Sequence, residues 1–581
     1  MNDQPPSAGP RPGRDDGVIV VGAGPVGCTA ALLLADQGVP VTLLERYPQP
    51  HPLPRAVHLD DEVARTLYRA GVSEQFLARS RSCSGLRLLD ADHRVMAEFR
   101  REHQVGVHGF PQANMFHQPD LEDLLLARAG QHPLIGLHRG VKVTGLDGAF
   151  GPLTGDHPVE VYAELAADGS GQTFTGRLVL GCDGANSTIR ELTGITMEDL
   201  GFTERWLVID IRSAKPLDTW DGVEQICDPA RAATFMQVTG HRYRWEFQLH
   251  DGEDEATMTS PDALGRLLEP WTGRRDLDGL EITRSATYTF RARLASAFQA
   301  GRAFLLGDAA HLTPPFIGQG LAAGLRDADN LAWKIAHVLS GQAGEDLLAS
   351  YEAERRPHAK AMIKKAIRVG WAMTGGQDRA AAVRRIALAA AVRSDRVCEV
   401  IASTATPRLK TGALHHPPRL LKPRTPATVR PGALIANPLV TTGAGVPAGD
   451  GTSAGEDATA RLDAVLRGRT AVLTARQPEP GLVDLCRRHG LLLVRISAPA
   501  TADDSAPAPE TARGWADVRI GGHNNAAPLQ ALISDPTLSV VVRPDRVIAA
   551  VATRSRLPRL PWSTPAATAP AADRMVASPR T

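Results

Sequence analysis

Clustered cysteines, an excess of charge of one sign and long apolar runs are all missing from this sequence. The six cysteines are far apart, with no C-x-x-C pair and no zinc-ligand spacing, which excludes a disulfide scaffold and favours free thiols in a reducing compartment. A net charge of +1, from 65 basic and 64 acidic residues, gives no electrostatic basis for binding nucleic acid or an anionic membrane. We therefore expect a cytoplasmic protein with neither partner.

The chain also lacks the apolar segments of an exported or membrane-spanning protein. Residues 18–34 are the most apolar early stretch, but they are short for a membrane span and contain three glycines and Pro25. Residues 1–16 are polar and proline-rich, without the apolar core of a signal peptide. We expect them to form a disordered leader.

The sequence patterns that are present predict an α/β fold with several domains. Residues 18–45 read as strand, glycine turn, helix and strand, which predicts a parallel sheet with crossover helices. Residues 201–295 contain period-two, aromatic runs such as WLVIDI and RYRWEFQL, typical of an antiparallel sheet. A sequence pattern typical of a buried strand occurs again near residue 302. We predict a Rossmann-like domain over 17–200 and 296–400, interrupted by a β-rich substrate domain over 201–295.

The C-terminal part indicates a smaller, separate domain. Residues 357–400 have helical spacing and predict covering helices, and residues 404–458 are rich in Pro, Gly and Thr, as in a linker. Residues 459–556 read as strand, helix and strand, followed by a hairpin that turns at Pro544-Asp545. Residues 557–581 have the composition of a disordered tail.

The first motif, GAGPVG over residues 22–27, lies between a strand and a helix. Gly22 permits a tight turn, Gly24 lets a pyrophosphate approach the backbone, and Gly27 allows the helix and strand to pack closely. Glu45 ends the next strand, where an acid binds the hydroxyls of an adenosine ribose that carries no phosphate. A glycine-rich turn without a ligand is the alternative interpretation.

Two weaker motifs follow. CDGANS, residues 182–187, comes after the strand LVLG, but Asp-Gly is also a common turn dipeptide. GDAAH, residues 307–311, precedes Pro314-Pro315 and the turn Gly318–Gly320, after which a helix begins near Leu321. That helix start would present free amides and a positive dipole end to a ligand at the glycines. Asp308 could instead cap a helix, and His311 could be a packed, hydrogen-bonded residue rather than a base.

The three motifs, in this order and with the β-rich block between the last two, resemble single-component flavoprotein aromatic hydroxylases of the p-hydroxybenzoate and phenol hydroxylase type. The resemblance covers about residues 17–370. LPRAVHLDDEVARTL, GQGLAAGLRDADNLAWKIAHVLSG and VVVRPDRVIAAVA are similar to the 3-(3-hydroxyphenyl)propionate hydroxylase branch. Members of that branch end in a thioredoxin-like domain, here with a lone Cys486 and hence no redox role.

The resemblance implies FAD as the cofactor and assigns residues to it. The ADP half would lie on the first motif and Glu45, with Arg55 and Gln118 reaching the cofactor from a neighbouring loop and helix. Asp183 would lie near both FAD and the nicotinamide, and Asp308 would bind the ribityl chain. The turn Gly318–Gly320 would lie against the flavin ring. The full set of expected FAD-binding residues is Val21, Gly22, Ala23, Gly24, Pro25, Val26, Gly27, Glu45, Arg46, Arg55, Gln118, Asp183, Gly307, Asp308, Ala309, Pro315, Gly318, Gln319, Gly320 and Leu321. His311 is the single catalytic candidate, and Ala322 stands where many relatives have Asn.

The implied reaction takes electrons from NADH or NADPH and one oxygen atom from O2 to hydroxylate a phenolic substrate next to its hydroxyl. The expected substrates are 3-(3-hydroxyphenyl)propionate and 3-hydroxycinnamate, with no metal and with a homodimer left open. The alternatives are a hydroxylase that tailors a polycyclic natural product and a non-catalytic flavoprotein. A flavin halogenase is disfavoured because the W-x-W-x-I-P segment is absent.

Overall fold

A computed structural model describes most of the chain outside its ends and several internal stretches. The described residues are 17–50, 54–101, 105–153, 157–228, 230–374, 407–409, 414, 429–442, 458–498, 515–520, 526–553 and 560. They divide into two compact units, one formed by residues 1–339 and 348–413 and the other by 340–347 and 414–581. The expected leader, most of the expected linker over 404–458 and all of the expected tail over 557–581 except Leu560 lie outside the described residues. The linker expectation is wrong for Leu439–Thr442, which form strand β21 in the sheet of the second unit. None of the helices in the described ranges is long and apolar enough to cross a membrane.

The first unit is built on a six-stranded sheet with β1 near its centre. The strand order is β18-β19-β12-β1-β2-β8, and all pairs except β18–β19 are parallel. The strands are β1 (Val18–Val21), β2 (Val41–Glu45), β8 (Ile135–Arg139), β12 (Leu178–Gly181), β18 (Gln299–Ala300) and β19 (Ala303–Leu305). Because crossover connections join parallel strands, helices must cover the sheet, as the sequence pattern predicts.

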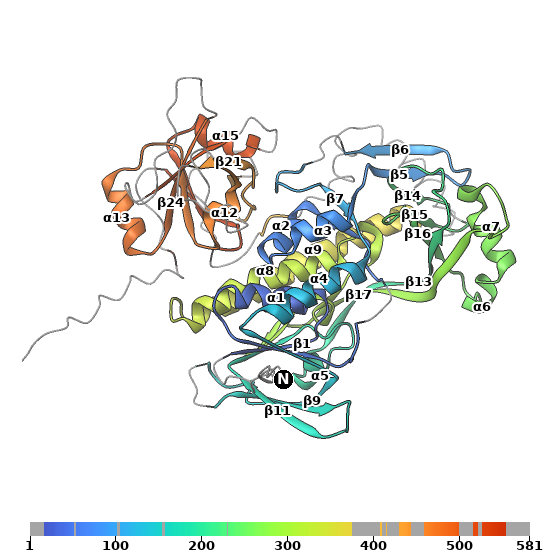
Figure 1. Cartoon of the computed structure of the whole chain (residues 1–581), viewed down its shortest axis with the longest axis horizontal. Helices are drawn as coiled ribbons and strands as arrows, with labels where there is room; N and C mark the ends of the chain where they lie inside the picture. Colours follow the sequence, from blue (N-terminus) through green and yellow to red (C-terminus); the bar gives the residue numbers. More distant parts are fainter. Residues whose placement is uncertain are drawn as a thin grey trace, which may run out of the picture. The chain divides into compact units, whose positions relative to one another are not determined.

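Three helices cover one face of this sheet, and a small antiparallel sheet lies on the other (Figure 1). The helices are α1 (Pro25–Ala35), α4 (Gln118–Gln131) and α8 (Gly320–Leu339), and the small sheet comprises β9 (Val141–Asp147), β10 (Val159–Leu165) and β11 (Gly171–Gly176). Ten of the eleven residues of α1 are buried, which explains its almost uniformly apolar sequence. One long helix, α9 (Asp346–Thr374), covers part of the expected helical region, and residues 375–400 lie outside the described part.

The β-rich region is larger than the sequence patterns indicate. It is an eight-stranded sheet of order β20-β17-β13-β16-β15-β14-β5-β6. Its strands are β5 (Gly85–Leu89), β6 (Val95–Arg100), β13 (Met197–Ser213), β14 (Val223–Ile226), β15 (Ala233–Gln237), β16 (Arg242–Gln248), β17 (Leu280–Ala295) and β20 (His311–Leu312). The predicted boundaries of 201–295 miss β5, β6 and β20, because strands from distant parts of the chain complete the sheet. Helices α6 (Glu255–Met258) and α7 (Pro261–Thr272) pack Met258, Leu264 and Leu268 against its apolar face.

Shorter elements connect these sheets. They are β3 (His58–Asp60), α2 (Asp61–Arg69), α3 (Ser73–Arg79), β4 (Arg81–Ser82), β7 (Ala113–Met115), α5 (Thr188–Leu192) and the 3-10 turns η1 (Gly307–Ala309) and η2 (Pro315–Ile317). Strands β3, β7 and β4 form a fourth sheet in this unit, with the order β3-β7-β4.

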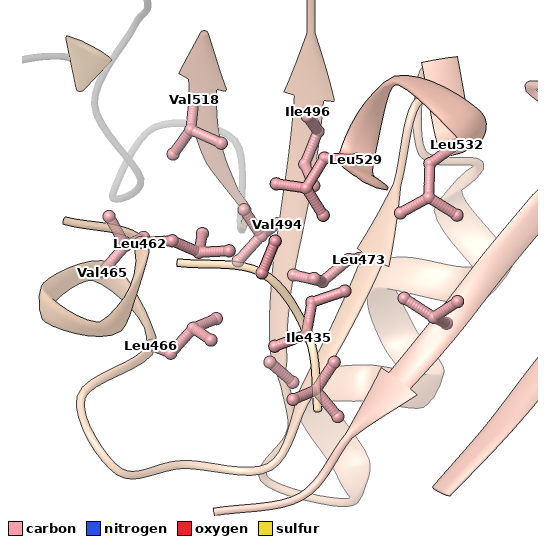
Figure 2. Close-up of a cluster of buried hydrophobic side chains, with 14 of the residues drawn as sticks. Ile435, Leu462, Val465, Leu466, Leu473, Val494, Ile496, Val518, Leu529 and Leu532 are labelled. Atoms are coloured by element: carbon pink, nitrogen blue, oxygen red, sulfur yellow. The ribbon is translucent and has the colours of Figure 1, made fainter. Parts of the chain in front are cut away.

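The second unit has its own mixed sheet and core. Its seven strands have the order β22-β21-β25-β24-β23-β26-β27, and the β26–β27 hairpin turns at the expected Pro544-Asp545. Side chains from the strands and from helices α12 (Leu462–Leu466) and α15 (Ala527–Ser534) point toward one another in this core (Figure 2). The remaining elements are β21 (Leu439–Thr442), β22 (Ala458–Arg461), β23 (Ala471–Thr474), α13 (Pro480–Arg488), β24 (Leu492–Ser497), β25 (Ala516–Ile520), β26 (Leu538–Val542) and β27 (Ile548–Thr553). Its thioredoxin-like character stays a prediction.

Candidate active site

The three sequence motifs meet at one edge of the parallel sheet. In the register, Val21 pairs with Leu44 and with Gly181, and Gly181 pairs with Leu305. The segments that follow β1, β2, β12 and β19 therefore leave the sheet side by side, and they carry the glycine motif, Glu45, Asp183 and Asp308. In open α/β sheets, ligands bind outside the carboxyl ends of the strands.

The three glycines of the first motif have different surroundings, as their expected roles require. Gly22 has φ +100°, and a Cβ there would lie 2.5 Å from the Cys182 carbonyl oxygen. A Cβ on Gly27 would lie 1.9 Å from the Gly22 carbonyl oxygen, so only glycine lets α1 pack against this turn. A Cβ on Gly24 would meet nothing within 4 Å. The space beside Gly24 and the start of α1, where no side chain caps the helix, can accept a phosphate group.

Glu45 is fixed by backbone amides at the end of β2. One carboxylate oxygen accepts a hydrogen bond from Ala23 N at 2.9 Å, and the other accepts one from Tyr47 N at 2.9 Å. A carboxylate oxygen has two lone pairs, so both can still accept a ribose hydroxyl. Arg46 is exposed, with its guanidinium 4.7 Å from the centre of the Tyr47 ring.

The turn that contains Asp308 packs tightly between α1 and α8. A Cβ on Gly307 would lie 3.1 Å from Val26 Cγ2, and a Cβ on Gly324 would lie 2.6 Å from the same atom. These contacts hold the first and third motifs together. The Val26 side chain packs against Gly307 and Gly324. Gly324 was not among the predicted site residues. Its lack of a side chain lets α8 lie close to Val26 of α1.

Asp308 lies inside η1 and does not cap a helix. Leu306, two residues before Asp308, is the N-cap of this turn and makes no side-chain capping bond. Burial raises the pKa of the Asp308 carboxyl, opposed by the charges of His311 and Arg55. Among the described residues, no group donates a hydrogen bond to this carboxylate, so its oxygens can accept hydroxyl groups of a cofactor.

Asp183 is held by the start of α5. Its two oxygens accept hydrogen bonds from Ser187 Oγ at 2.5 Å and from Ile189 N at 3.1 Å, while burial raises its pKa. The Arg190 guanidinium donates to the Ala309 carbonyl oxygen at 3.1 Å and to the Ala185 carbonyl oxygen at 2.9 Å. Arg190 thereby links the second motif to the third.

Gln118 is hydrogen-bonded to the backbone of the loop that carries Arg55. The Gln118 side-chain oxygen accepts hydrogen bonds from Arg55 N at 2.9 Å and from Ala56 N at 2.6 Å, and its amide group donates to Glu122 at 2.6 Å. The Arg55 side chain is exposed. In this structure Gln118 positions the loop that carries Arg55.

The β-rich sheet holds the same loop from the other side, which sequence reasoning missed. Arg244 donates to the carbonyl oxygens of Arg55 at 2.7 Å and Pro54 at 2.9 Å, and it pairs with Asp210 at 2.7 and 2.9 Å. Arg284 also donates to the Pro54 carbonyl oxygen. These contacts to the loop join residues 189 to 230 positions apart. Only the strand alternation of RYRWEFQL could have indicated that Arg244 lies off the apolar face.

A buried network anchors the turn Gly318–Gly320. Gln319 donates to Asp60 at 3.0 Å and accepts from Arg326 at 2.8 Å, and Arg326 also pairs with Asp60 at 2.5 Å. Gly318 has φ +60°, and a Cβ there would lie 3.2 Å from His58 Nδ1. The Gln319 side chain is therefore committed to the turn, whereas Gly320 and Leu321, both half-buried, begin α8. Pro315 is half-buried in η2, and Ala322 is fully buried.

His311 lies in β20 and is 1% exposed. Its Nε2 is 2.7 Å from Asp327 Oδ2, and Nδ1 has no partner among the described residues. Asp327 also accepts from Gly307 N at 3.1 Å and from Arg355 Nε at 2.8 Å. This environment agrees with the packed, hydrogen-bonded alternative, and a proton-transfer role for His311 stays a prediction that the burial does not favour.

Comparisons with known proteins identify a family and several relatives. Residues 15–366 match the family described as FAD binding domain. A protein of Rhodococcus jostii (strain RHA1), a probable NADH-specific resorcinol 4-hydroxylase, is 35% identical over 390 residues, which cover 67% of this chain and 71% of that protein. A 3-(3-hydroxy-phenyl)propionate/3-hydroxycinnamic acid hydroxylase of Mycolicibacterium smegmatis (strain ATCC 700084 / mc(2)155) is 33% identical over 563 residues, which cover 94% of this chain and 92% of that protein.

The solved structures support the fold. The ternary complex of aklavinone-11 hydroxylase with FAD and aklavinone superposes with a TM-score of 0.70 at 21% identity, covering 95% of this chain and 96% of that chain. The flavin-dependent monooxygenase PieE, in complex with FAD and substrate, gives a TM-score of 0.71 at 20% identity, covering 94% and 97%.

Proposed function

The chain belongs to the FAD binding domain family, and we propose that it hydroxylates 3-(3-hydroxyphenyl)propionate or 3-hydroxycinnamate next to the ring hydroxyl. It is an FAD-dependent monooxygenase that acts on aromatic rings and takes electrons from NAD(P)H. The observation that carries the proposed substrate is the 33% identity to a hydroxylase of these compounds along 94% of the chain. We further propose NADH as the electron donor, because the Rhodococcus relative is named as a probable NADH-specific hydroxylase.

We assign the FAD to the edge where the three motifs meet. The first motif and Glu45 would hold the ADP half, Asp308 the ribityl chain, and the Gly318–Gly320 turn would back the ring. Gly24, with open space beside it, and the Asp308 carboxylate, without a hydrogen bond among the described residues, both fit a dinucleotide. When bound, FAD supplies the electron transfer and oxygen activation. The protein positions the ring and excludes water.

The test is product analysis by mass under labelled O2. We expect NADH oxidation to be slow alone and strongly stimulated by either phenol, with one labelled oxygen in the 2,3-dihydroxy product. Equal NADH consumption with and without these phenols, yielding only peroxide, would contradict the substrate assignment and favour a larger polycyclic phenol. A cytoplasmic location and a homodimer also remain proposals, the latter to be tested by light scattering.

A further inference from the structure

The eight-stranded sheet has one apolar face and one face with charged side chains. Successive residues of a strand point to opposite faces. In β16, Tyr243, Trp245 and Phe247 belong to the apolar core, so Arg244 and Glu246 lie on the other face. The register places Glu246 opposite Val208 on one side and opposite Thr234 on the other.

Two contacts locate Glu246 relative to the proposed flavin site. On the same face, Arg244 holds the carbonyl oxygens of the Pro54–Arg55 loop, and Trp206 lies 5.7 Å, centre to centre, from the Phe316 ring in η2. Trp206 pairs with Gln248, and Arg244 pairs with Asp210. Glu246 therefore lies on this face between the Arg244–Asp210 pair and the Gln248–Trp206 pair. Arg244 contacts the Arg55 loop and Trp206 contacts Phe316 in η2, and both segments carry residues that we assign to FAD.

The Glu246 carboxylate is half-buried and accepts no hydrogen bond from the described residues. Its side chain is 12% exposed, and its nearest ionic neighbour is Arg244 Nη1, at 4.0 Å. The short bonds of Arg244 go to Asp210 and to the loop, and no hydrogen bond to Glu246 occurs in the part of the chain that the structure describes. Burial raises the pKa of Glu246, Asp210 raises it further, and Arg244 and Arg284 oppose the shift. Such a carboxylate can accept a proton, and no described residue of the protein donates a hydrogen bond to it.

We propose that Glu246 is a catalytic base, which accepts the proton of the substrate's ring hydroxyl while oxygen is delivered to the neighbouring carbon. This inference rests on the phenolic substrate proposed above. As the new C–O bond forms, the ring loses electron density and its hydroxyl becomes acidic. The O–H bond breaks, its electron pair forms the ring C=O, and the proton moves to a Glu246 oxygen and then to water. As the C–O bond forms, the O–O bond of O2, reduced by the two electrons of NADH, breaks and the second oxygen atom leaves as water. The dienone then loses its ring C–H proton to water while its C=O oxygen takes up a proton, which gives the catechol.

The same charge would orient the substrate. A carboxylate attracts a hydroxyl proton and repels another anion, and the repulsion is stronger in a buried site than in water. The ring hydroxyl would therefore point toward Glu246 and the propionate away from it. A phenol that is already ionised should bind poorly for the same reason.

The experiment compares Glu246→Gln with the unmodified holoenzyme. Glu281→Gln, at an exposed position of β17 in the same sheet, is the matched control. We expect Glu246→Gln to keep FAD and phenol-stimulated NADH oxidation, while hydroxylated product per NADH falls at least tenfold and peroxide rises. General-base catalysis typically contributes about 10²–10⁴-fold to rate. The decline of kcat/KM at acid pH, where Glu246 is protonated, should disappear in the variant.

A binding measurement separates charge from structure. The 4-nitrophenolate anion, followed by its absorbance, should bind Glu246→Gln more tightly than the unmodified holoenzyme, by about tenfold, and Glu281→Gln unchanged. Unaltered coupling, pH profile and nitrophenolate affinity in Glu246→Gln would overturn the role of Glu246 alone. If the unmodified enzyme hydroxylates no phenol while consuming NADH, the proposed function fails and the base assignment fails with it.

Discussion

Gly24 and Gly27 lie three residues apart, and the structure gives them opposite sensitivities. Gly24 has φ −71° and ψ −179°, which alanine can adopt, and its Cβ would meet no protein atom within 4 Å. A Cβ on Gly27 would lie 1.9 Å from a backbone oxygen. The first glycine is therefore free to serve a ligand, whereas the second serves packing.

We predict that Gly24→Ala leaves the stability of the apoprotein within about 0.5 kcal/mol but lowers FAD affinity at least tenfold, because the methyl group occupies the space proposed for the pyrophosphate. Gly27→Ala should instead cost about 1–3 kcal/mol or more of unfolding free energy, through overpacking. Urea unfolding of the apoproteins and FAD titration by fluorescence measure the two effects. Unchanged FAD affinity in Gly24→Ala would place the pyrophosphate elsewhere.

Asp308 offers a test of the ribityl assignment. Its carboxylate has no hydrogen-bond donor among the described residues, so its removal should spare the fold and reduce cofactor binding. A hydrogen bond to a charged group contributes about 1.5–3 kcal/mol, so Asp308→Ala should weaken FAD binding about ten- to a hundredfold. Equilibrium dialysis gives the affinity, and Asp251→Ala, at an exposed turn, is the control. Full FAD occupancy in Asp308→Ala would remove this residue from the cofactor site.

At the scale of elements, β16 and β13 hold the Arg55 loop through a buried ion pair. Among the described residues, removing Arg244 leaves Asp210 with Arg284, 3.5 Å away. It also leaves the Arg55 carbonyl oxygen without its donor, while the Pro54 carbonyl oxygen keeps its bond from Arg284. Breaking a buried pair from one side typically costs about 3–5 kcal/mol, so Arg244→Met should be strongly destabilising. Arg212→Met, at an exposed position of β13, should stay within about 0.5 kcal/mol.

The control for lost packing is the double variant Asp210→Asn/Arg244→Met. It should be less destabilised than the sum of the single variants, since the uncompensated charge is gone. FAD titration should show weaker binding in Arg244→Met than in Arg212→Met. Equal stability and equal FAD affinity of these two variants would show that the ion pair does not support the loop.

The sequence predicted the elements that carry local signals and missed those that depend on distant partners. The strand–glycine–helix pattern at 18–35 gives β1, α1 and the packing role of Gly27, because Gly27 meets Gly22 only five residues away. By contrast, β5 pairs with β14 across more than 130 residues, and no local pattern indicates that pairing. For Arg244 and Glu246, strand alternation separates two faces, but only the assembled sheet shows which face meets the Arg55 loop.

At the scale of the whole chain, the two units each have a separate hydrophobic core. Leu32 is fully buried in α1 of the first unit, and Leu473 is fully buried in β23 of the second. The proposed FAD residues all belong to residues 1–339, in the first unit. A ligand that binds only one unit stabilises only that unit, unless the two unfold together.

We therefore predict two unfolding transitions in calorimetry, of which FAD shifts one. At free FAD one hundred times its dissociation constant, the first unit gains about 2.7 kcal/mol, so its transition should move to a higher temperature while the other stays. Leu32→Ala should lower only the FAD-sensitive transition and Leu473→Ala only the other, each by the roughly 2–5 kcal/mol typical of a buried leucine. A single transition that moves as a whole with FAD, and with either variant, would show that the two cores unfold as one cooperative structure.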